Sequence, residues 1–181
     1  PWERFIPKGG QFPVKGHCLN SALHSVPACQ AIVKKAVAAR LGAKYGLNTL
    51  PETGALYQIQ FSIMKDTATL MLDTSGPGLY KRGYRAHGVD APLRETLAAA
   101  MVILSRYRGR DPLCDPFCGS GTIPIEAALI ARHRAPGLNR TFPAQQLACV
   151  DQKLWPEAAD EAQGKEFDGD SQTWVGGLHT H

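Results

Sequence analysis

The sequence lacks any apolar run long enough to cross a membrane. Its longest apolar-rich stretches, residues 97–104 and 123–131, fall short of the roughly 18–20 residues that a spanning helix needs. The first residues also lack a starting Met, a basic leader and an apolar core, so no signal peptide is expected. Aromatic residues make up only 8%, but the 44% hydrophobic and 20% charged fractions are ordinary for a globular chain. We expect a folded protein with no membrane partner.

Cysteine is sparse and odd in number, which argues against a disulfide framework. Cys114 and Cys118 have no second pair to complete a zinc pattern, and the nearest histidine is His133. His179 and His181 lack a third ligand, so no metal site is expected. We interpret the cysteines as buried structural thiols in a reducing cytoplasm.

Acidic residues are scarce in the first half of the chain. Residues 1–85 carry 11 Lys and Arg against four Asp and Glu, whereas residues 86–150 carry seven against five. Residues 151–181 reverse the balance, with two against seven, and the whole chain has a net charge of +4. Such a basic half favours a module that binds a polyanion. The same excess of Lys and Arg over Asp and Glu is also expected if these cations are simply solvated on an ordinary protein surface.

Residues 26–45 are predicted to form a helix. Ser25 suits the N-cap, Pro27 the first turn and Gly46 the stop. We place Lys34 and Lys35 away from the apolar arc of this helix. That arc comprises Ile32, Val33, Ala36, Val37 and Leu41.

A β-hairpin with one buried face is expected next. Tyr57, Ile59, Phe61 and Ile63 alternate with polar residues, 65–66 suits a turn, and 67–73 alternates again with Ala68, Leu70 and Leu72 on one face. A further short strand is placed near 12–14. Together these elements predict a small α/β module over residues 1–85.

A second module is predicted from residue 86 onward. Pro92 opens a helix that ends near 107–109, and its apolar stripe consists of Leu93, Leu97, Ala100, Met101 and Leu104. A short strand over 112–115, a glycine loop and a helix over 123–133 follow. An acidic helix is expected at 156–163, and Trp174-Val175 could start another strand.

Two segments carry candidate chemistry. Residues 79–85 interleave three cations with two tyrosines, which suits phosphate contact and base stacking, or equally a packed sheet edge. In the glycine loop, Gly119 and Gly121 let a cofactor approach bare backbone, and Asp115 can accept hydrogen bonds from a cationic amino group. No Lys follows Gly121 and no third glycine is present, which excludes the mononucleotide loop and the full dinucleotide pattern.

The longer string D-P-F-C-G-S-G-T at 115–122, with I-P-I-E-A-A at 123–128, resembles motif I of a family of S-adenosylmethionine-dependent RNA methyltransferases. L-D-T-S-G-P-G-L-Y-K-R-G-Y-R at 72–85 resembles the junction that follows the THUMP domain in that family. A-P-L-R-E-T-L-A at 91–98 is similar to its first catalytic-domain helix. The resemblance covers about residues 1–177 and is greatest to bacterial enzymes that methylate guanine N2 in large-subunit ribosomal RNA.

This resemblance implies an α/β fold, with a THUMP-like RNA-binding module over 1–85 and the start of a Rossmann-like class I methyltransferase domain over 86–181. It implies S-adenosyl-L-methionine as the cofactor and structured RNA, ribosomal RNA in particular, as the partner. The implied cofactor-binding positions are Asp115, Pro116, Cys118, Gly119, Ser120, Gly121, Thr122 and Glu126, with Thr122 and Glu126 supporting the loop and the helix start. The candidate RNA contacts are Lys34, Lys35, Lys81, Arg82, Tyr84 and Arg85.

The sequence departs from the family in two places. In the family, an acidic residue at the end of the second catalytic strand binds the cofactor ribose, but none follows Gly176-Gly177 here. The sequence also contains no Pro-Pro pair, so it lacks the catalytic Asn-Pro-Pro-Tyr motif of the family. We therefore assign no catalytic residue and expect an internal fragment that binds cofactor weakly or undetectably and is inactive alone. Two alternatives remain open, a non-enzymatic RNA-binding fragment and an adenine-N6 DNA methyltransferase; the oligomeric state is left open as well.

Overall fold

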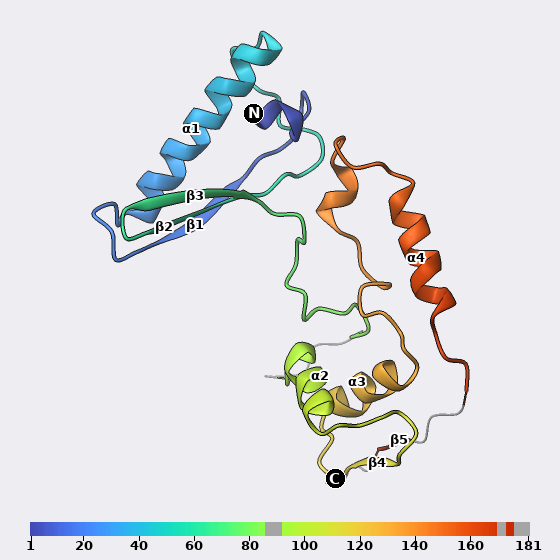
Figure 1. The fold of residues 1–181 in the computed structure, drawn as a ribbon. Helices are drawn as coiled ribbons and strands as arrows, with labels where there is room; N and C mark the ends of the chain where they lie inside the picture. Colours follow the sequence, from blue (N-terminus) through green and yellow to red (C-terminus); the bar gives the residue numbers. More distant parts are fainter. Residues whose placement is uncertain (86–91, 170–172, 176–181) are drawn as a thin grey trace, which may run out of the picture. The chain divides into compact units, whose positions relative to one another are not determined.

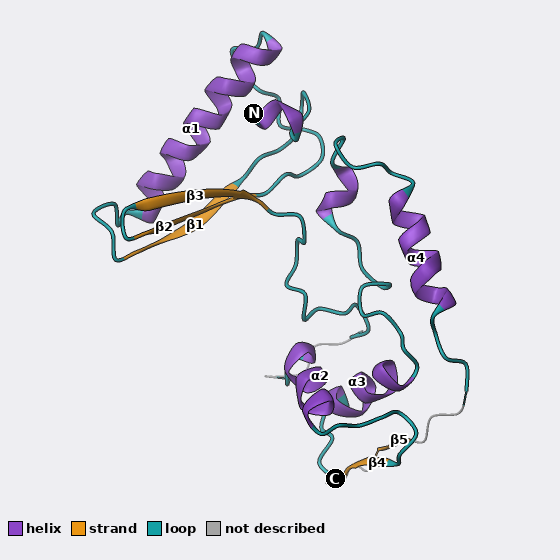
Figure 2. Cartoon of the chain, viewed as in Figure 1, coloured by secondary structure: helices purple, strands orange, loops and turns teal. Residues whose placement is uncertain are grey.

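The computed structural model describes residues 1–85, 92–169 and 173–175. The chain folds into two compact α/β units (Figures 1 and 2). The N-terminal unit comprises residues 1–76 and 142–152, and the C-terminal unit comprises the described residues of 77–141 and 153–181. The division thus falls at Gly76–Pro77, earlier than the predicted boundary at residue 85, and 142–152 lies with the first unit instead of the second.

A three-stranded sheet and one long helix build the N-terminal unit. The sheet comprises β1 (Val14–Leu19), β2 (Ile59–Met64) and β3 (Thr67–Leu72) in the order β1-β2-β3. β1 runs parallel and β3 antiparallel to the central β2. α1 (Val26–Tyr45) packs against β1 and runs obliquely to the strands in Figure 1. The short 3₁₀ helices η1 (Trp2–Arg4) and η2 (Pro143–Gln146) complete the unit. The predicted helix bounds are confirmed, whereas the first strand lies later than the predicted 12–14.

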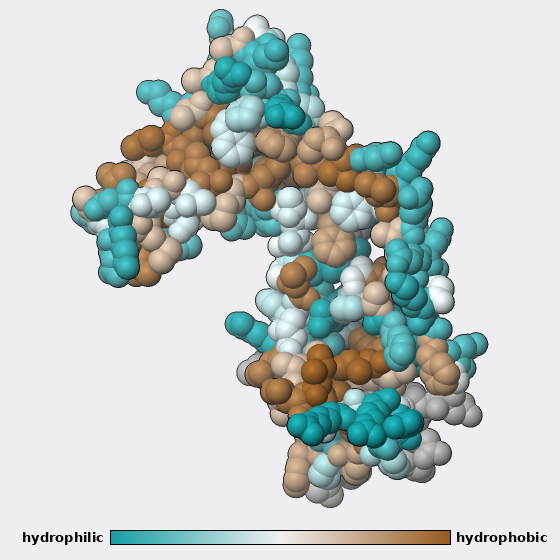
Figure 3. Space-filling view, viewed as in Figure 1, coloured by the Kyte–Doolittle hydropathy of each residue, from teal (hydrophilic) through white to brown (hydrophobic). Residues whose placement is uncertain are grey.

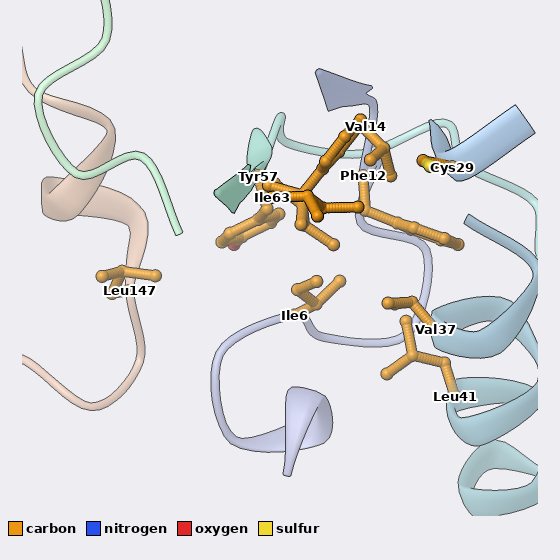
Figure 4. Close-up of a cluster of buried hydrophobic side chains, with 11 residues drawn as sticks. Ile6, Phe12, Val14, Cys29, Val37, Leu41, Tyr57, Ile63 and Leu147 are labelled. Atoms are coloured by element: carbon orange, nitrogen blue, oxygen red, sulfur yellow. The ribbon is translucent and has the colours of Figure 1, made fainter. Parts of the chain in front are cut away.

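The core of this unit follows the alternation seen in the sequence. Tyr57, Ile59, Phe61 and Ile63 are all buried, as predicted. Leu147 joins them from the returning segment 142–152, and Figure 4 shows this cluster. The remaining members are Ile6, Phe12, Val14, Cys29, Val37 and Leu41.

The buried stripe of α1 is narrower than predicted. Cys29, Val37 and Leu41 are buried, but Ile32 is 65% exposed. These three positions are spaced by four or eight residues, so they form a single row along the helix. Only this row of side chains packs into the core, whereas the predicted apolar arc was wider. Lys34, which we expected to point elsewhere, is half-buried beside this row.

The face of β3 is correctly predicted but mostly uncovered. Leu70 pairs with Phe61 and Ala68 with Ile63, so these side chains share the face that β2 buries. Leu70 is nevertheless 47% exposed, because β3 is an edge strand and α1 packs beside β1 at the opposite edge.

The C-terminal unit contains the strand–loop–helix element that the sequence predicts. Its elements are α2 (Glu95–Leu104), β4 (Leu113–Asp115), α3 (Thr122–Ala131), α4 (Leu154–Gly164) and β5 (Thr173–Val175). β4 and β5 pair in parallel, which confirms both predicted strands. None of the helices in the described part of the chain has the length and apolar character needed to span a membrane.

The buried face of α2 differs from the predicted stripe. Ala98 and Val102 are buried where α2 packs against α3, whereas Leu97 and Met101 are about half exposed. Nearly every residue of this helix is apolar, so the pattern cannot select a face and the small residues make the close helix contact. Figure 3 accordingly shows apolar side chains remaining at the surface.

Candidate functional site

The glycine loop lies between the end of β4 and the first turn of α3. Gly119 has a φ of +51° and Gly121 a φ of +73°, values that side-chain-bearing residues rarely adopt. Gly121 directly precedes α3 and acts as its N-cap residue. The first free backbone N–H groups of a helix therefore follow immediately after the loop.

Two internal hydrogen bonds shape the loop. The Phe117 amide donates to Asp115 Oδ1 at 3.2 Å, and the Gly121 amide donates to the Cys118 carbonyl at 2.7 Å. Asp115 thus holds the turn that starts at its own strand end, in addition to any ligand it accepts. This dual role explains why a short Asp side chain suits this position.

One side of the loop is open. Apart from the two chain neighbours of Gly119, no residue that the structure describes has an atom within 4 Å of the point where a Gly119 Cβ atom would stand, and Phe117 is 85% exposed. Pro116 and Ser120 are also exposed, while Cys118 is half-buried. Bare backbone, a strand-end carboxylate and a helix start fit a polar cofactor such as S-adenosylmethionine.

Arg85 is bound to the far end of the loop. Its Nη2 atom donates to Thr122 Oγ1 at 2.6 Å and to the Leu93 carbonyl at 3.0 Å. Its Nη1 atom lies 3.3 Å from Ser120 Oγ, and its Nε atom donates to Glu95 Oε1 at 2.6 Å. All three guanidinium nitrogens therefore have partners within the C-terminal unit.

Glu126 is buried one turn after Thr122 and faces residues 82–84. The Tyr84 hydroxyl donates to Glu126 Oε1 at 3.0 Å, and Arg82 Nε lies 3.5 Å from the same oxygen. Burial, then the Glu126 carboxylate, raises the pKa of Tyr84 well above its ordinary value. This internal contact agrees with the supporting role expected of Glu126, and its place among the cofactor-binding positions stays a prediction.

The candidate RNA-binding residues separate into two groups. Arg82, Tyr84 and Arg85 are half-buried and bind side chains or carbonyls of their own unit, and their assignment as RNA contacts stays a prediction. Lys35 and Lys81 are exposed. For these two the RNA contact stays a prediction.

Lys34 also has internal partners. Its Nζ atom lies 2.5 Å from Glu52 Oε2, 3.1 Å from the Phe12 carbonyl and 3.5 Å from the centroid of the Phe12 ring. An ammonium held by a carboxylate and an aromatic face is poorly placed to neutralise a phosphate. The structure therefore gives Lys34 a packing role, and its RNA contact stays an untested prediction.

An open groove of about 500 Å³ lies elsewhere in the C-terminal unit. Residues 77–83 form one wall and 138–141 the other, and Lys81 lines it. Arg140 donates to the carbonyls of Pro77, Gly78 and Lys81, which fixes the wall of the groove. No residue of the glycine loop lines this groove.

Sequence reasoning missed Glu95 as a partner of the loop. Glu95 as a residue is 5% exposed, and its ten-residue separation from Arg85 matches no helical or strand period. An acidic residue among the apolar residues of 93–104 is the one signal that could have found it. A buried carboxylate requires a cation, and the nearby arginines are the candidates for that partner.

Two family models match the chain. Residues 82–175 match the family described as RMKL-like, methyltransferase domain, and residues 1–73 match the THUMP domain. The first match covers more than half of the chain, and together the two matches follow the order expected from the sequence. The glycine loop and Arg85 both fall within the methyltransferase match.

Among curated proteins, the chain is similar to "Putative RNA methyltransferase YpsC" of Bacillus subtilis, with 48% identity over 166 residues. That alignment covers 91% of this chain and 43% of the relative. The chain therefore spans less than half the length of this relative.

Solved structures show the same relationship. A "predicted N6-adenine-specific DNA methylase" from Listeria monocytogenes has a TM-score of 0.92 and 47% identity, over 98% of this chain and 47% of that one. SMU.472, "a putative methyltransferase complexed with SAH", has a TM-score of 0.88 and 40% identity, over 96% and 47%. These similarities include the two units and the glycine loop between β4 and α3.

Proposed function

Because the chain belongs to the RMKL-like methyltransferase family and carries a THUMP domain, we propose that it forms the RNA-binding module and the cofactor loop of an S-adenosylmethionine-dependent RNA methyltransferase. The observation that carries the proposal is the open glycine loop at the end of β4, preceded in the chain by a THUMP domain. The solved relative that contains S-adenosylhomocysteine supports the cofactor class.

In this proposal Asp115 accepts hydrogen bonds from the cofactor while also holding the turn at Phe117. The backbone of 118–121 admits the cofactor without Cβ interference, and the N–H groups at the start of α3 favour its polar groups. S-adenosylmethionine, when bound, supplies an electrophilic methyl group. These residues contribute binding and orientation, which are the main sources of acceleration in such transfers.

The acceptor that we propose is the exocyclic N2 of a guanine in ribosomal RNA, methylated in the cytoplasm. Support comes from the family resemblance of residues 72–85 and 115–128 and from the relative named as an RNA methyltransferase. The target base must be unpaired or flipped out of its helix, because a stacked base cannot reach a cofactor held in a loop.

The second candidate function is adenine-N6 methylation of DNA, which the name of the Listeria relative favours. A THUMP domain in the same chain favours RNA instead. Binding of the chain to structured ribosomal RNA and to duplex DNA at matched salt separates the two. The proposal expects tighter binding to RNA, and equal or tighter binding to duplex DNA would contradict it.

The exposed lysines allow a sharper version of this experiment. Replacing Lys35 or Lys81 with Ala should reduce the slope of log affinity against log salt by about 0.7–0.9 for each lost phosphate contact. Lys34→Ala is the matched control, since its ammonium is held by Glu52 and Phe12. RNA binding without any cofactor binding would support a non-enzymatic RNA-binding fragment.

A further inference from the structure

Arg85 connects three segments of the C-terminal unit through one side chain. It binds the carboxylate of Glu95 in α2, the Leu93 carbonyl before α2, and the hydroxyls of Ser120 and Thr122 on either side of Gly121. We propose that Arg85 is a positioning residue that fixes the end of the glycine loop for the cofactor. The link to a cofactor rests on the proposed function, whereas the link to the loop does not.

The geometry favours this role over phosphate binding. Each guanidinium nitrogen of Arg85 already donates a hydrogen bond, and its side chain is only 22% exposed. Glu95, whose side chain is 7% exposed, neutralises the charge at 2.6 Å. The four hydrogen bonds use four of the five N–H groups of Arg85, so a phosphate would have to bind through the one that remains or displace an internal partner.

The loop has a physical need for such a contact. Gly119 and Gly121 both lie in the left-handed region, where glycine is also free to adopt many other conformations. The hydrogen bond from the Gly121 amide to the Cys118 carbonyl holds the loop from inside. Arg85 adds restraint from outside, at the residues that flank Gly121.

The segment that carries Arg85 is itself fixed. Gly83 has a φ of +87°, and a Cβ atom there would lie 2.5 Å from the Asn139 carbonyl oxygen. The next residue, Tyr84, binds Glu126 one helical turn after Thr122. The adjacent residues Tyr84 and Arg85 therefore bind successive turns of α3, at Glu126 and Thr122. These contacts fix the backbone position from which the Arg85 side chain extends.

Backbone amide hydrogen exchange of the 181-residue chain, measured by NMR without cofactor, tests the positioning role. Arg85→Lys keeps the charge but loses the planar fork, and Thr122→Val removes the acceptor at nearly constant volume. We expect exchange of the Gly121 amide to accelerate about 10-fold or more in each variant, the factor that the loss of one charged hydrogen bond implies. Thr122→Ser, which retains the hydroxyl, should restore wild-type exchange.

The controls separate positioning from general stability. Arg108→Lys changes an exposed arginine of the same unit and should leave the Gly121 amide unaffected. The acceleration in the double variant Arg85→Lys/Thr122→Val should be smaller than the product of the two single accelerations, because both substitutions remove the Arg85–Thr122 contact while each also removes a contact with Ser120. Equal acceleration at Val102 and Ala127 inside the helices, or none at Gly121, would overturn the proposal.

Titration of the same variants with S-adenosylhomocysteine tests the link to the cofactor. Arg85→Lys should weaken binding about 10-fold, while affinity for ribosomal RNA stays at the wild-type value. If the wild-type chain does not bind S-adenosylhomocysteine, the proposed function fails while the exchange data still decide the role of Arg85 in the loop. If Arg85→Lys lowers the affinity for RNA and leaves hydrogen exchange in the loop unchanged, Arg85 contacts RNA and does not position the loop.

Discussion

The Tyr84 hydroxyl donates a 3.0 Å hydrogen bond to Glu126, a residue that is 2% exposed in the first turns of α3. A buried carboxylate that loses a donor keeps its desolvation cost, so this contact matters more than its single hydrogen bond suggests. It also shows that the hydroxyl of a tyrosine from a basic, aromatic segment has a partner inside its own unit.

Replacing Tyr84 with Phe should destabilise the C-terminal unit by about 1–3 kcal/mol, because Glu126 then lacks this donor. Urea unfolding checks the value. Tyr107→Phe is the matched control, since the Tyr107 hydroxyl is buried and has no hydrogen-bond partner among the described residues. That control should be neutral or stabilising; equal losses in the two variants would show that Tyr84 contributes through packing alone.

The backbone elements were largely predictable because their signals are local. Alternation at Tyr57–Ile63 and the caps at Ser25 and Gly46 depend on neighbours a few residues away, and the structure confirms both elements. The glycine loop was found for the same reason, since Asp115 and the glycines lie within one short string.

The partners of the cations were not predictable, because they depend on contacts between distant residues. Lys34 binds Glu52 from 18 positions away, and Arg85 reaches Thr122 across 37. Charge counting treats such residues as surface cations. Only the tertiary structure shows that Arg85 is neutralised inside its unit whereas Lys81 is exposed.

Adjacent lysines of α1 should behave in opposite ways. Lys34→Met should lower the stability of the N-terminal unit by roughly 1 kcal/mol, because it removes a partly exposed ion pair and the contact with the Phe12 ring. Lys35→Met should stay within about 0.5 kcal/mol of wild type. Thermal unfolding compares them, and the reverse order would contradict the packing role of Lys34.

Gly16 should tolerate no side chain. It pairs with Phe61, and a Cβ atom at Gly16 would lie 2.2 Å from the Phe61 carbonyl oxygen, which is too close for any contact. Gly16→Ala should therefore destabilise the N-terminal unit by about 3 kcal/mol or more. Gly164→Ala meets no atom within 4 Å and should be neutral or slightly stabilising in the same denaturation assay.

Stability at acidic pH should depend on Glu3. A hydrogen bond from Arg40 is the main cause that lowers the pKa of Glu3 from 4.5 to about 2. Between these values the unfolded state binds the proton and the folded state does not, so stability falls as pH decreases from 4.5 towards 2. Glu3→Gln should flatten this part of the stability–pH curve, and a variant curve parallel to wild type would show that other carboxylates cause the loss.

The most direct test of the account is an NMR titration of the chain with S-adenosylhomocysteine at up to millimolar concentration. We predict saturable shifts of the Phe117, Gly119 and Gly121 amides, no shifts in β2, and loss of the response in Asp115→Ala. Absence of loop shifts in the wild-type chain, or an undiminished response in Asp115→Ala, would contradict the assignment of this loop as the cofactor site.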